Sequence, residues 1–218
     1  MGRPSDARQR LLDVACTLIG RRGYSGLGVA EICTAAGVPK GSFYYFFDSK
    51  QGLSHAVIDQ HWSAQRAQWT AILSDNSRDG LVLPRLRTLF EATATTQREQ
   101  QRNGGAVTGC LFANLALELS AQDHDARVHL QRVFDEQVDM IAGLIEEAAE
   151  RGELRRPVRP MIAATAVVAQ LEGLVLFAKL ANDPSQLDHL WEQTLLLLGA
   201  GEHLSVTASE DSSERPKS

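Results

Sequence analysis

Cysteine is scarce in this chain, and long apolar runs are missing. The three cysteines among 218 residues, Cys16, Cys33 and Cys110, are widely spaced and fit neither a disulfide framework nor a zinc site. This scarcity is consistent with a reducing compartment. No run of about 18 uninterrupted apolar residues occurs, which predicts that no helix spans a membrane. The opening residues, MGRPSDARQR, are polar and unlike a signal peptide, so we expect a cytoplasmic protein.

Motifs that bind metals or phosphate are also missing. His55 and His61 are not at an i, i+4 spacing, and His124 and His129 are five residues apart, so neither pair shares one helical face. Without ligand spacing, solvated or hydrogen-bonded histidines are favoured over metal ligands. The Gly104–Gly105 pair is not a phosphate loop, because no strand precedes it and no Lys-Ser or Lys-Thr pair follows. We therefore predict no metal and no cofactor.

The charge is unevenly distributed along the chain. The net charge is −5, which argues against indiscriminate binding of nucleic acid. Residues 1–52, however, hold seven basic and four acidic residues, a charge of +3, which leaves −8 for the remainder. A basic N-terminal module on an acidic body would orient the protein on a polyanion, although chance alone also produces such an imbalance.

Residues 27–53, LGVAEICTAAGVPKGSFYYFFDSKQGL, form the most informative segment. A helix over 29–36 is predicted because its apolar residues recur at the spacing of one helical face. Gly37 follows where a left-handed C-cap belongs, and Pro39 prevents the helix from continuing. These features predict a tight turn between two short helices.

The second short helix is predicted over 40–47. Phe43, Phe46 and Phe47 fall at i, i+3 and i+4 and would point into a core. A cation, hydroxyl donors and a glycine that permits close approach are left for the outer surface, a composition typical of a helix that reads DNA. The residues of this predicted outer surface are Lys40, Gly41, Ser42, Tyr44 and Tyr45. A solvated face that binds nothing is the alternative, and two exposed tyrosines argue against it.

The segment GVPKGSFYYFFDSKQGL, residues 37–53, resembles the recognition region of TetR-family transcriptional regulators, which typically runs G-V-S-K-G-T-L-Y-H-Y-F-x-S-K-E-x-L. The resemblance is ungapped and extends over about residues 7–55. It implies that the five outer residues of the second helix contact phosphates and base edges, and that Lys50 contacts the DNA backbone. At the start of the first short helix, Gly28 replaces the usual Thr or Ser, so contacts at Gly28 and Val29 must come from backbone N–H groups.

The resemblance implies an all-α protein of about nine helices with two parts. We predict a helix-turn-helix DNA-binding domain over 5–52, a ligand-binding and dimerisation domain over 53–204, and a disordered tail over 205–218. Helices are expected to begin at Ser5 or Asp6 and at Ser49, and an apolar helix over 110–120 is expected to be buried. The last two helices, near 157–180 and 186–200, are expected to pair with their copies in a homodimer. The alternative is that they serve only as core.

Within the body, an apolar pocket for a small inducer is predicted. Its expected lining residues are Phe90, Phe112, Leu115, Phe134 and Phe177. Cys110 lies near a helix start, where the helix dipole lowers a thiol pKa. The pattern T-G-C-L, together with Lys179 in F-A-K-L, resembles a TetR branch that includes repressors responsive to electrophiles. We therefore hypothesise that Cys110 senses an electrophile with the help of Lys179; an inert core cysteine is the alternative.

These predictions describe a repressor that binds a palindromic operator as a dimer and is released by a small apolar or electrophilic inducer. A helix-turn-helix protein without a ligand, acting as an architectural or accessory factor, is the alternative. An enzyme with Cys110 as nucleophile is not expected, because no positioned base is visible near it.

Overall fold

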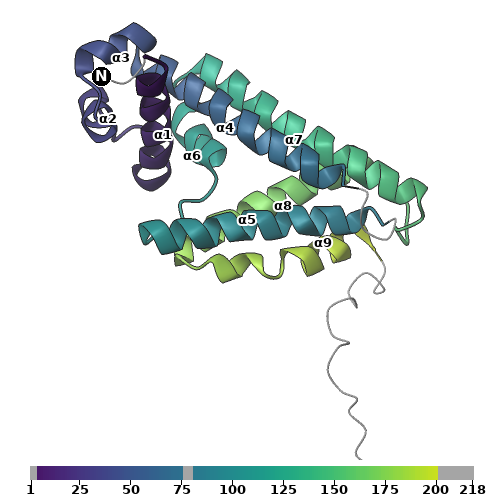
Figure 1. Cartoon of the computed structure of the whole chain (residues 1–218). Coiled ribbons are helices and arrows are strands. Elements are labelled where there is room, and N and C mark those ends of the chain that lie inside the picture. The colour runs from purple at the N-terminus through teal and green to yellow at the C-terminus, as the bar shows by residue number, and fades with distance from the viewer. Residues whose placement is uncertain (1–3, 76–80, 201–218) are drawn as a thin grey trace, which may run out of the picture.

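The computed structural model describes residues 4–75 and 81–200, and within them it contains nine α-helices and one short 3-10 helix (Figure 1). The helices are α1 (Pro4–Arg22), α2 (Val29–Ala36), α3 (Lys40–Phe46), α4 (Lys50–Leu73), α5 (Leu83–Gly104), α6 (Leu111–Leu119), α7 (His124–Glu150), α8 (Pro160–Ala181), η1 (Pro184–Leu187) and α9 (Leu190–Leu198). The single extended pairing in these ranges is an isolated bridge between Leu154 and Ala200. The all-α prediction is therefore confirmed.

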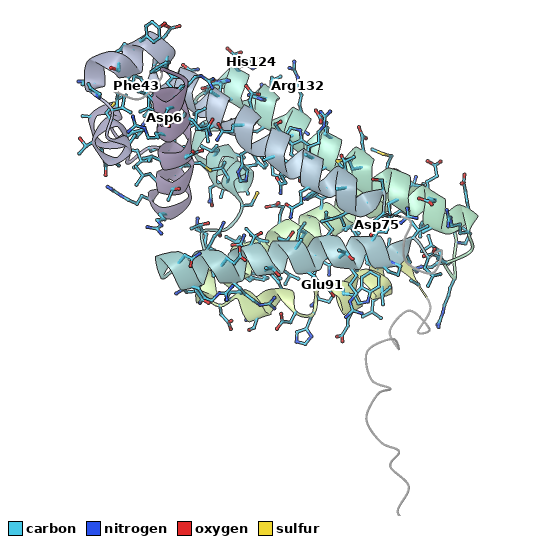
Figure 2. All side chains as sticks on the ribbon, in the orientation of Figure 1. Asp6, Phe43, Asp75, Glu91, His124 and Arg132 are labelled. Atoms are coloured by element: carbon cyan, nitrogen blue, oxygen red, sulfur yellow. The ribbon has the colours of Figure 1, made fainter. Side chains whose placement is uncertain are left out.

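Helices α1, α2 and α3 form a compact N-terminal group around Phe43 (Figures 1 and 2). Phe43 is fully buried, as are Leu11 and Leu12 of α1, and Ile32 of α2 packs in the same cluster. The predicted short helices therefore form where their apolar periodicity placed them. The second one ends at Phe46 because Phe47 adopts an extended conformation.

Helix α4 carries the chain from the N-terminal group into the body, where it runs beside α7 (Figure 1). The Ser49 hydroxyl accepts a hydrogen bond from the Gly52 N–H at 3.0 Å, so the predicted N-cap is confirmed. Leu53, Val57 and Trp62 of α4 pack in the same core cluster as Phe43. The predicted domain boundary after residue 52 thus falls inside a continuous helix. The first half of this helix packs into the core of the N-terminal group.

The body is a layered bundle in which α5, α8 and α9 lie beneath the α4–α7 pair (Figure 1). Its core is separate from that of the N-terminal group and gathers residues from α5, α8, α9 and the C-terminal half of α7. The helix predicted near 186–200 is divided, because Pro184 starts a 3-10 turn capped by Asp183 before α9 begins at Leu190. The tail over 205–218 lies outside the described residues.

Helix α6 lies between α1 and the body (Figure 1). Phe112 and Leu115 are fully buried, but Leu117 is 83% exposed. The prediction that this helix is buried on most sides was therefore wrong for its outer face. A monomer offers this face no neighbouring helix to cover it.

Candidate DNA-binding and effector sites

Helix α3 presents an aromatic and polar face on the side opposite its buried phenylalanine. Tyr44 is 53% exposed and Tyr45 is 79% exposed, whereas Phe43 is fully buried. The other predicted contact residues of the helix are exposed or half-buried: Lys40, Gly41 and Ser42. A Cβ atom placed on Gly41 would meet no atom within 4 Å, so the backbone at this point is open to close approach.

Aromatic contacts hold the two tyrosines in place. The rings of Phe43 and Tyr44 meet edge to face with centroids 5.3 Å apart, and those of Tyr45 and Phe46 meet similarly at 5.0 Å. Such pairs favour one ring orientation, because the positive edge of one ring meets the negative face of the other. The contacts with Phe43 and Phe46 therefore favour fixed positions for the two tyrosine rings and their hydroxyls on the exposed face of α3.

The turn between α2 and α3 is closed by backbone hydrogen bonds. Gly37 has a φ of 61°, in the left-handed region that favours glycine, and the Val38 N–H donates to the Cys33 carbonyl at 2.9 Å. Arg10 of α1 adds a bond from Nη1 to the Ala36 carbonyl at 3.1 Å. The predicted C-cap at Gly37 is confirmed, and it fixes the angle at which α3 leaves α2.

Gly28 and Val29 lie where α2 begins. Gly28 is exposed in an extended conformation, and no side chain caps the helix. The first hydrogen bond within α2 is donated by Ile32 to the Gly28 carbonyl, so the N–H groups before Ile32 have no intrahelical acceptor. The expected backbone contact to a phosphate at Gly28 and Val29 remains a prediction that this geometry allows.

Lys50 is already engaged within the protein. Its ammonium donates to the Tyr24 carbonyl at 3.0 Å and to the Leu27 carbonyl at 2.9 Å, and it lies 4.0 Å from the centroid of the Tyr24 ring. These contacts fasten the loop between α1 and α2 to the start of α4. The predicted contact with the DNA backbone would have to compete with them, and it remains a prediction.

Glu118 of α6 binds the same loop, and the sequence did not reveal it. Its carboxylate accepts hydrogen bonds from the Tyr24 N–H at 2.8 Å and the Ser25 N–H at 2.6 Å. Burial opposes its ionisation, but the bonds from Ser25 and Tyr24 outweigh burial and lower the pKa of Glu118. Gly23 leaves room for this contact, because a Cβ there would lie 2.7 Å from Glu118 Oε1. Helix α6 is therefore bonded directly to the DNA-reading module.

A cavity of about 840 Å³, called here the outer cavity, lies between α6, α7 and α8. Its walls are mostly apolar and include Phe134, Val138 and Leu176, with Cys110 and Lys179 among the polar groups. This volume falls in the range of about 300–1,000 Å³ that is typical of small-molecule sites.

A second cavity of about 230 Å³, called here the inner cavity, lies between α4, α5 and α8. Cys110 and Glu172 line both cavities. The pair therefore forms part of the wall between the two spaces, at the N-terminal end of α6.

The chemistry around Cys110 differs from the expected arrangement. Burial, followed by the neighbouring Glu172 carboxyl, raises the pKa of the Cys110 thiol well above its ordinary value of 9.0. The prediction that the helix N-terminus would lower this pKa was therefore wrong in direction, because burial and the carboxyl outweigh the helix dipole. Lys179 donates to Asn114 Oδ1 at 2.7 Å, and its aliphatic stem passes Gly109. A sensing role for Cys110 and Lys179 remains a prediction, with Glu172 as an unexpected third member.

The predicted aromatic lining is only partly brought together. Phe134 lines the outer cavity. Phe90, Phe112 and Leu115 are buried in the two cores and line neither cavity. Phe177 was misplaced by the prediction, because it is 55% exposed on the outer side of α8. Apolar periodicity identified buried residues, but it could not separate those beside a cavity from those that are fully packed.

The remaining histidines and cysteines make pairwise contacts. Cys16 Sγ lies 3.8 Å from His61 Nδ1, and burial lowers the pKa of His61 and raises the pKa of Cys16 to about 11. His129 lies 2.8 Å from Asp59. Within residues 4–75 and 81–200, no group of three His, Cys, Asp or Glu residues could hold a metal ion.

A band of exposed apolar residues runs along α8 and reaches α6 and α9. Its members are Leu117, Met161, Ile162, Leu176, Phe177, Leu180 and Leu196. Helix α8 is long and apolar enough to cross a membrane by composition alone, but a core helix of a folded protein passes the same test. Its Ala164, Val167 and Ala178 are buried against the body, so α8 has one face in the core and one face uncovered.

Comparison with known proteins agrees with this architecture. Residues 11–57 match the model for bacterial regulatory proteins of the tetR family, and residues 82–194 match the tetracyclin repressor-like C-terminal domain. The transcriptional repressor DhaR of Mycobacterium sp. (strain GP1) is 33% identical over 83% of this chain and 86% of its own length.

Two solved structures are similar over most of the chain. The regulatory protein TetR from Rhodobacter sphaeroides has a TM-score of 0.78 and 32% identity, covering 86% of this chain and 96% of that one. The reduced form of NemR from E. coli has a TM-score of 0.75 and 26% identity, covering 90% and 100%. These relatives are transcriptional regulators rather than enzymes. The exposed recognition helix, the helical body and the two family matches together show that this chain is a DNA-binding transcriptional regulator and belongs to the TetR family.

Proposed function

We propose that this regulator is a repressor that binds a palindromic operator as a homodimer and leaves it when a small apolar or electrophilic effector binds the body. The observation that carries the DNA-binding half is the exposed face of α3 over a fully buried Phe43. In a two-fold dimer, two such helices would lie about 34 Å apart and enter successive major grooves. The regulator would act in the cytoplasm, where the DNA is.

The contacts with DNA divide by chemistry. Lys40, Ser42 and the tyrosine hydroxyls would bind phosphates, which fixes position, and only part of this set would read base edges. Gly28 and Val29 would add backbone N–H donors at the start of α2. Lys50 would contribute mainly by holding the loop between α1 and α2 in place, because its ammonium already contacts Tyr24 and Leu27.

The dimer would form through the uncovered faces of α8 and α9. Leu180 is 73% exposed and Leu196 is 79% exposed, which is unusual for large apolar side chains on adjacent helices. Pairing these faces with their copies would build a four-helix bundle and shield Leu180 and Leu196 from water. Leu180→Glu should convert the dimer to a monomer in light-scattering measurements, whereas Ala67→Glu on the exposed side of α4 should not.

The effector would bind in the outer cavity beside Cys110. An electrophile such as a quinone would form a carbon–sulfur bond with Cys110 Sγ, and the thiol proton would end on the adduct, so no outside oxidant is required. The raised pKa of the thiol predicts slow reaction unless binding displaces Glu172 or brings Lys179 closer. The likeness to NemR, which was solved in a reduced form, supports a role for thiol chemistry.

Helix α6 supplies a route from the effector to DNA. Cys110 caps its N-terminus in the cavity wall, and Glu118 in its last turn binds the loop between α1 and α2. An effector that binds better to a conformation with α6 and α4 displaced would change the spacing of the two α3 helices. Release therefore requires differential affinity for the two conformations.

Measurements of operator binding test both parts of the proposal, which are DNA binding by α3 and release by a thiol-reactive effector. We would select an operator from a random duplex pool and measure its affinity by fluorescence anisotropy at fixed salt, with and without N-ethylmaleimide. Tyr45→Ala should weaken binding without unfolding the protein, and N-ethylmaleimide should release wild-type protein but not Cys110→Ser. If Cys110→Ser is released equally, the thiol half of the proposal fails while DNA binding stands.

A DNA-binding accessory factor without a ligand is the competing function. Such a protein needs no cavity in its body, whereas this body has an open cavity of about 840 Å³ beside α6. Unchanged operator affinity across a broad effector panel would favour that alternative.

A further inference from the structure

Two residues that line the inner cavity each carry a buried side-chain oxygen that lacks a hydrogen-bond partner. Gln65 Oε1 of α4 and Glu172 Oε2 of α8 are both shielded from solvent, and neither is bonded to any described residue. Both residues line the same space of about 230 Å³. An unpaired buried acceptor costs about 1–3 kcal/mol, and more when it is charged, so two in one small cavity call for an explanation.

The Glu172 carboxyl also lacks a counter-charge. Among residues 4–75 and 81–200, it forms no ion pair. Lys179, two turns further along α8, donates to Asn114 instead. His61, which also lines the inner cavity, is kept neutral because burial lowers its pKa. The group next to the carboxyl is the Cys110 thiol, which is neutral because its pKa is raised.

The other residues that line the inner cavity suit a small organic molecule. Trp69, Leu89, Leu171 and Val175 supply apolar surface to the same cavity. An indole in the wall also favours a cation, because its ring face is negative. The volume corresponds to roughly eight waters at about 30 Å³ each, which limits the ligand to a small molecule.

From this arrangement we propose that the inner cavity binds a small protonated primary amine, with Glu172 Oε2 and Gln65 Oε1 accepting hydrogen bonds from its ammonium. One ammonium carries three N–H donors, enough for both oxygens. The ion pair supplies the counter-charge that Glu172 lacks, and the apolar wall holds the carbon skeleton. This inference goes beyond the proposed function, since it assigns a second ligand, of another chemical class, to the inner cavity of the same body. Glu172 is the residue that selects the charge of the ligand.

Binding of benzylamine tests the proposal directly. The intact protein would be titrated calorimetrically at a pH of about 7.5, where the amine is protonated, against benzyl alcohol and benzoate as neutral and anionic isosteres. Benzylamine should bind at least about tenfold more tightly than either isostere, because only it supplies the missing charge. Equal binding of benzyl alcohol would show that the site needs only a neutral donor, and it would overturn the proposal.

Substitutions distinguish the specific contribution of the Glu172 carboxylate to amine binding from a general effect of the protein's charge. Glu172→Gln should weaken benzylamine binding by about 30-fold or more, since one partner of a buried charge pair is removed. Gln65→Leu should weaken it by a smaller factor, and Glu150→Gln on the exposed surface of α7 should leave it unchanged. Circular dichroism and operator affinity would confirm that each variant is folded.

The failures of the two proposals are distinguishable. If neither benzylamine nor n-butylamine binds at millimolar concentration while operator binding is intact, the cavity holds only water. The amine proposal then fails and the repressor proposal stands. If operator binding is absent while benzylamine still binds through Glu172, the repressor proposal fails and the amine proposal stands.

Discussion

The DNA-reading module and the body, in which we propose the effector site, differ in how far their polar groups are paired. In the module, carbonyls at Tyr24 and Leu27 accept from Lys50, and the N–H groups of Tyr24 and Ser25 donate to Glu118. In the body, Gln65, Glu172 and Trp191 each keep a buried polar atom that lacks a partner within the described residues. The module is thus held in one conformation, whereas the body retains groups that an added molecule could satisfy.

This difference agrees with the proposal that DNA binds to the module and the effector binds to the body. A surface that must fit DNA gains from ordering in advance, because less conformational entropy is lost on binding. A body that must change shape gains from cavities and unpaired groups, since a ligand that satisfies them stabilises one conformation over another. Helix α6 joins the two regions, and the following substitutions break or sharpen the comparison.

Phe43→Ala should have the largest effect and should damage the module alone. Removal of a fully buried aromatic ring typically costs about 3–5 kcal/mol. Chemical denaturation followed by circular dichroism should show the loss, and operator binding should disappear. The dimer should persist in light scattering, because the proposed interface lies on the exposed faces of α8 and α9, whose buried faces belong to the other core. A monomeric variant would show that the two regions do not fold separately.

Glu172→Gln should stabilise the body in a manner that depends on pH. Burial raises the pKa of Glu172 from 4.5 to about 6, so folding favours its protonated form. Wild-type stability should therefore fall as pH rises from about 4.5 to about 6 and remain lower above that range, by about 2 kcal/mol.

The variant should lack this loss, because an amide does not ionise. Thermal denaturation between pH 4 and pH 8, at about one-unit intervals, compares the two proteins while the Cys110 thiol stays neutral throughout. Parallel curves for wild type and variant would contradict the assigned environment of Glu172.

Glu118→Gln should weaken communication between the regions more than it weakens either region. The variant replaces charge-assisted hydrogen bonds to the Tyr24 and Ser25 N–H groups with weaker ones, a change of about 1–2 kcal/mol. Hydrogen exchange at these two amides should accelerate, and the effector should change operator affinity by a smaller factor. Exposed Glu150→Gln is the matched control, and an undiminished effector response would remove α6 from the route.

Tyr45→Phe should have the smallest effect and should be confined to DNA. The substitution removes a hydroxyl from a side chain that is 79% exposed, so stability should change by less than about 0.5 kcal/mol. Loss of one hydrogen bond to a phosphate should weaken operator binding by about 1 kcal/mol, which is about fivefold. Anisotropy titrations measure the change, and unaltered affinity would mean that the ring rather than the hydroxyl contacts DNA.

Local sequence signals predicted the module well because short-range physics decides it. Gly37 is needed for a left-handed C-cap, Ser49 accepts a hydrogen bond three residues away, and the apolar spacing within each of the two short helices turns Ile32 and Phe43 inward. Each of these interactions joins residues that are close in the chain or share one helical face.

The body was predicted less well because its site depends on contacts between distant segments. Phe177 and Leu117 have the apolar character of core residues, yet both are exposed. Cys110 was paired with Lys179 from a resemblance, whereas the fold places Glu172 at the thiol and Asn114 at the lysine. Periodicity shows that a face is apolar, but it does not show which helix, cavity or second subunit covers that face.

By itself the sequence determined most of the helices, the caps at Gly37 and Ser49 and the exposed face of α3, since these follow from backbone conformation and from apolar spacing along one element. Only the tertiary structure decided that Glu118 binds a loop 93 residues away, that Lys50 faces inward, and that Glu172 shares a cavity with Gln65. Such contacts depend on how helices pack against one another, and side-chain packing in three dimensions is not encoded in any single stretch of the chain.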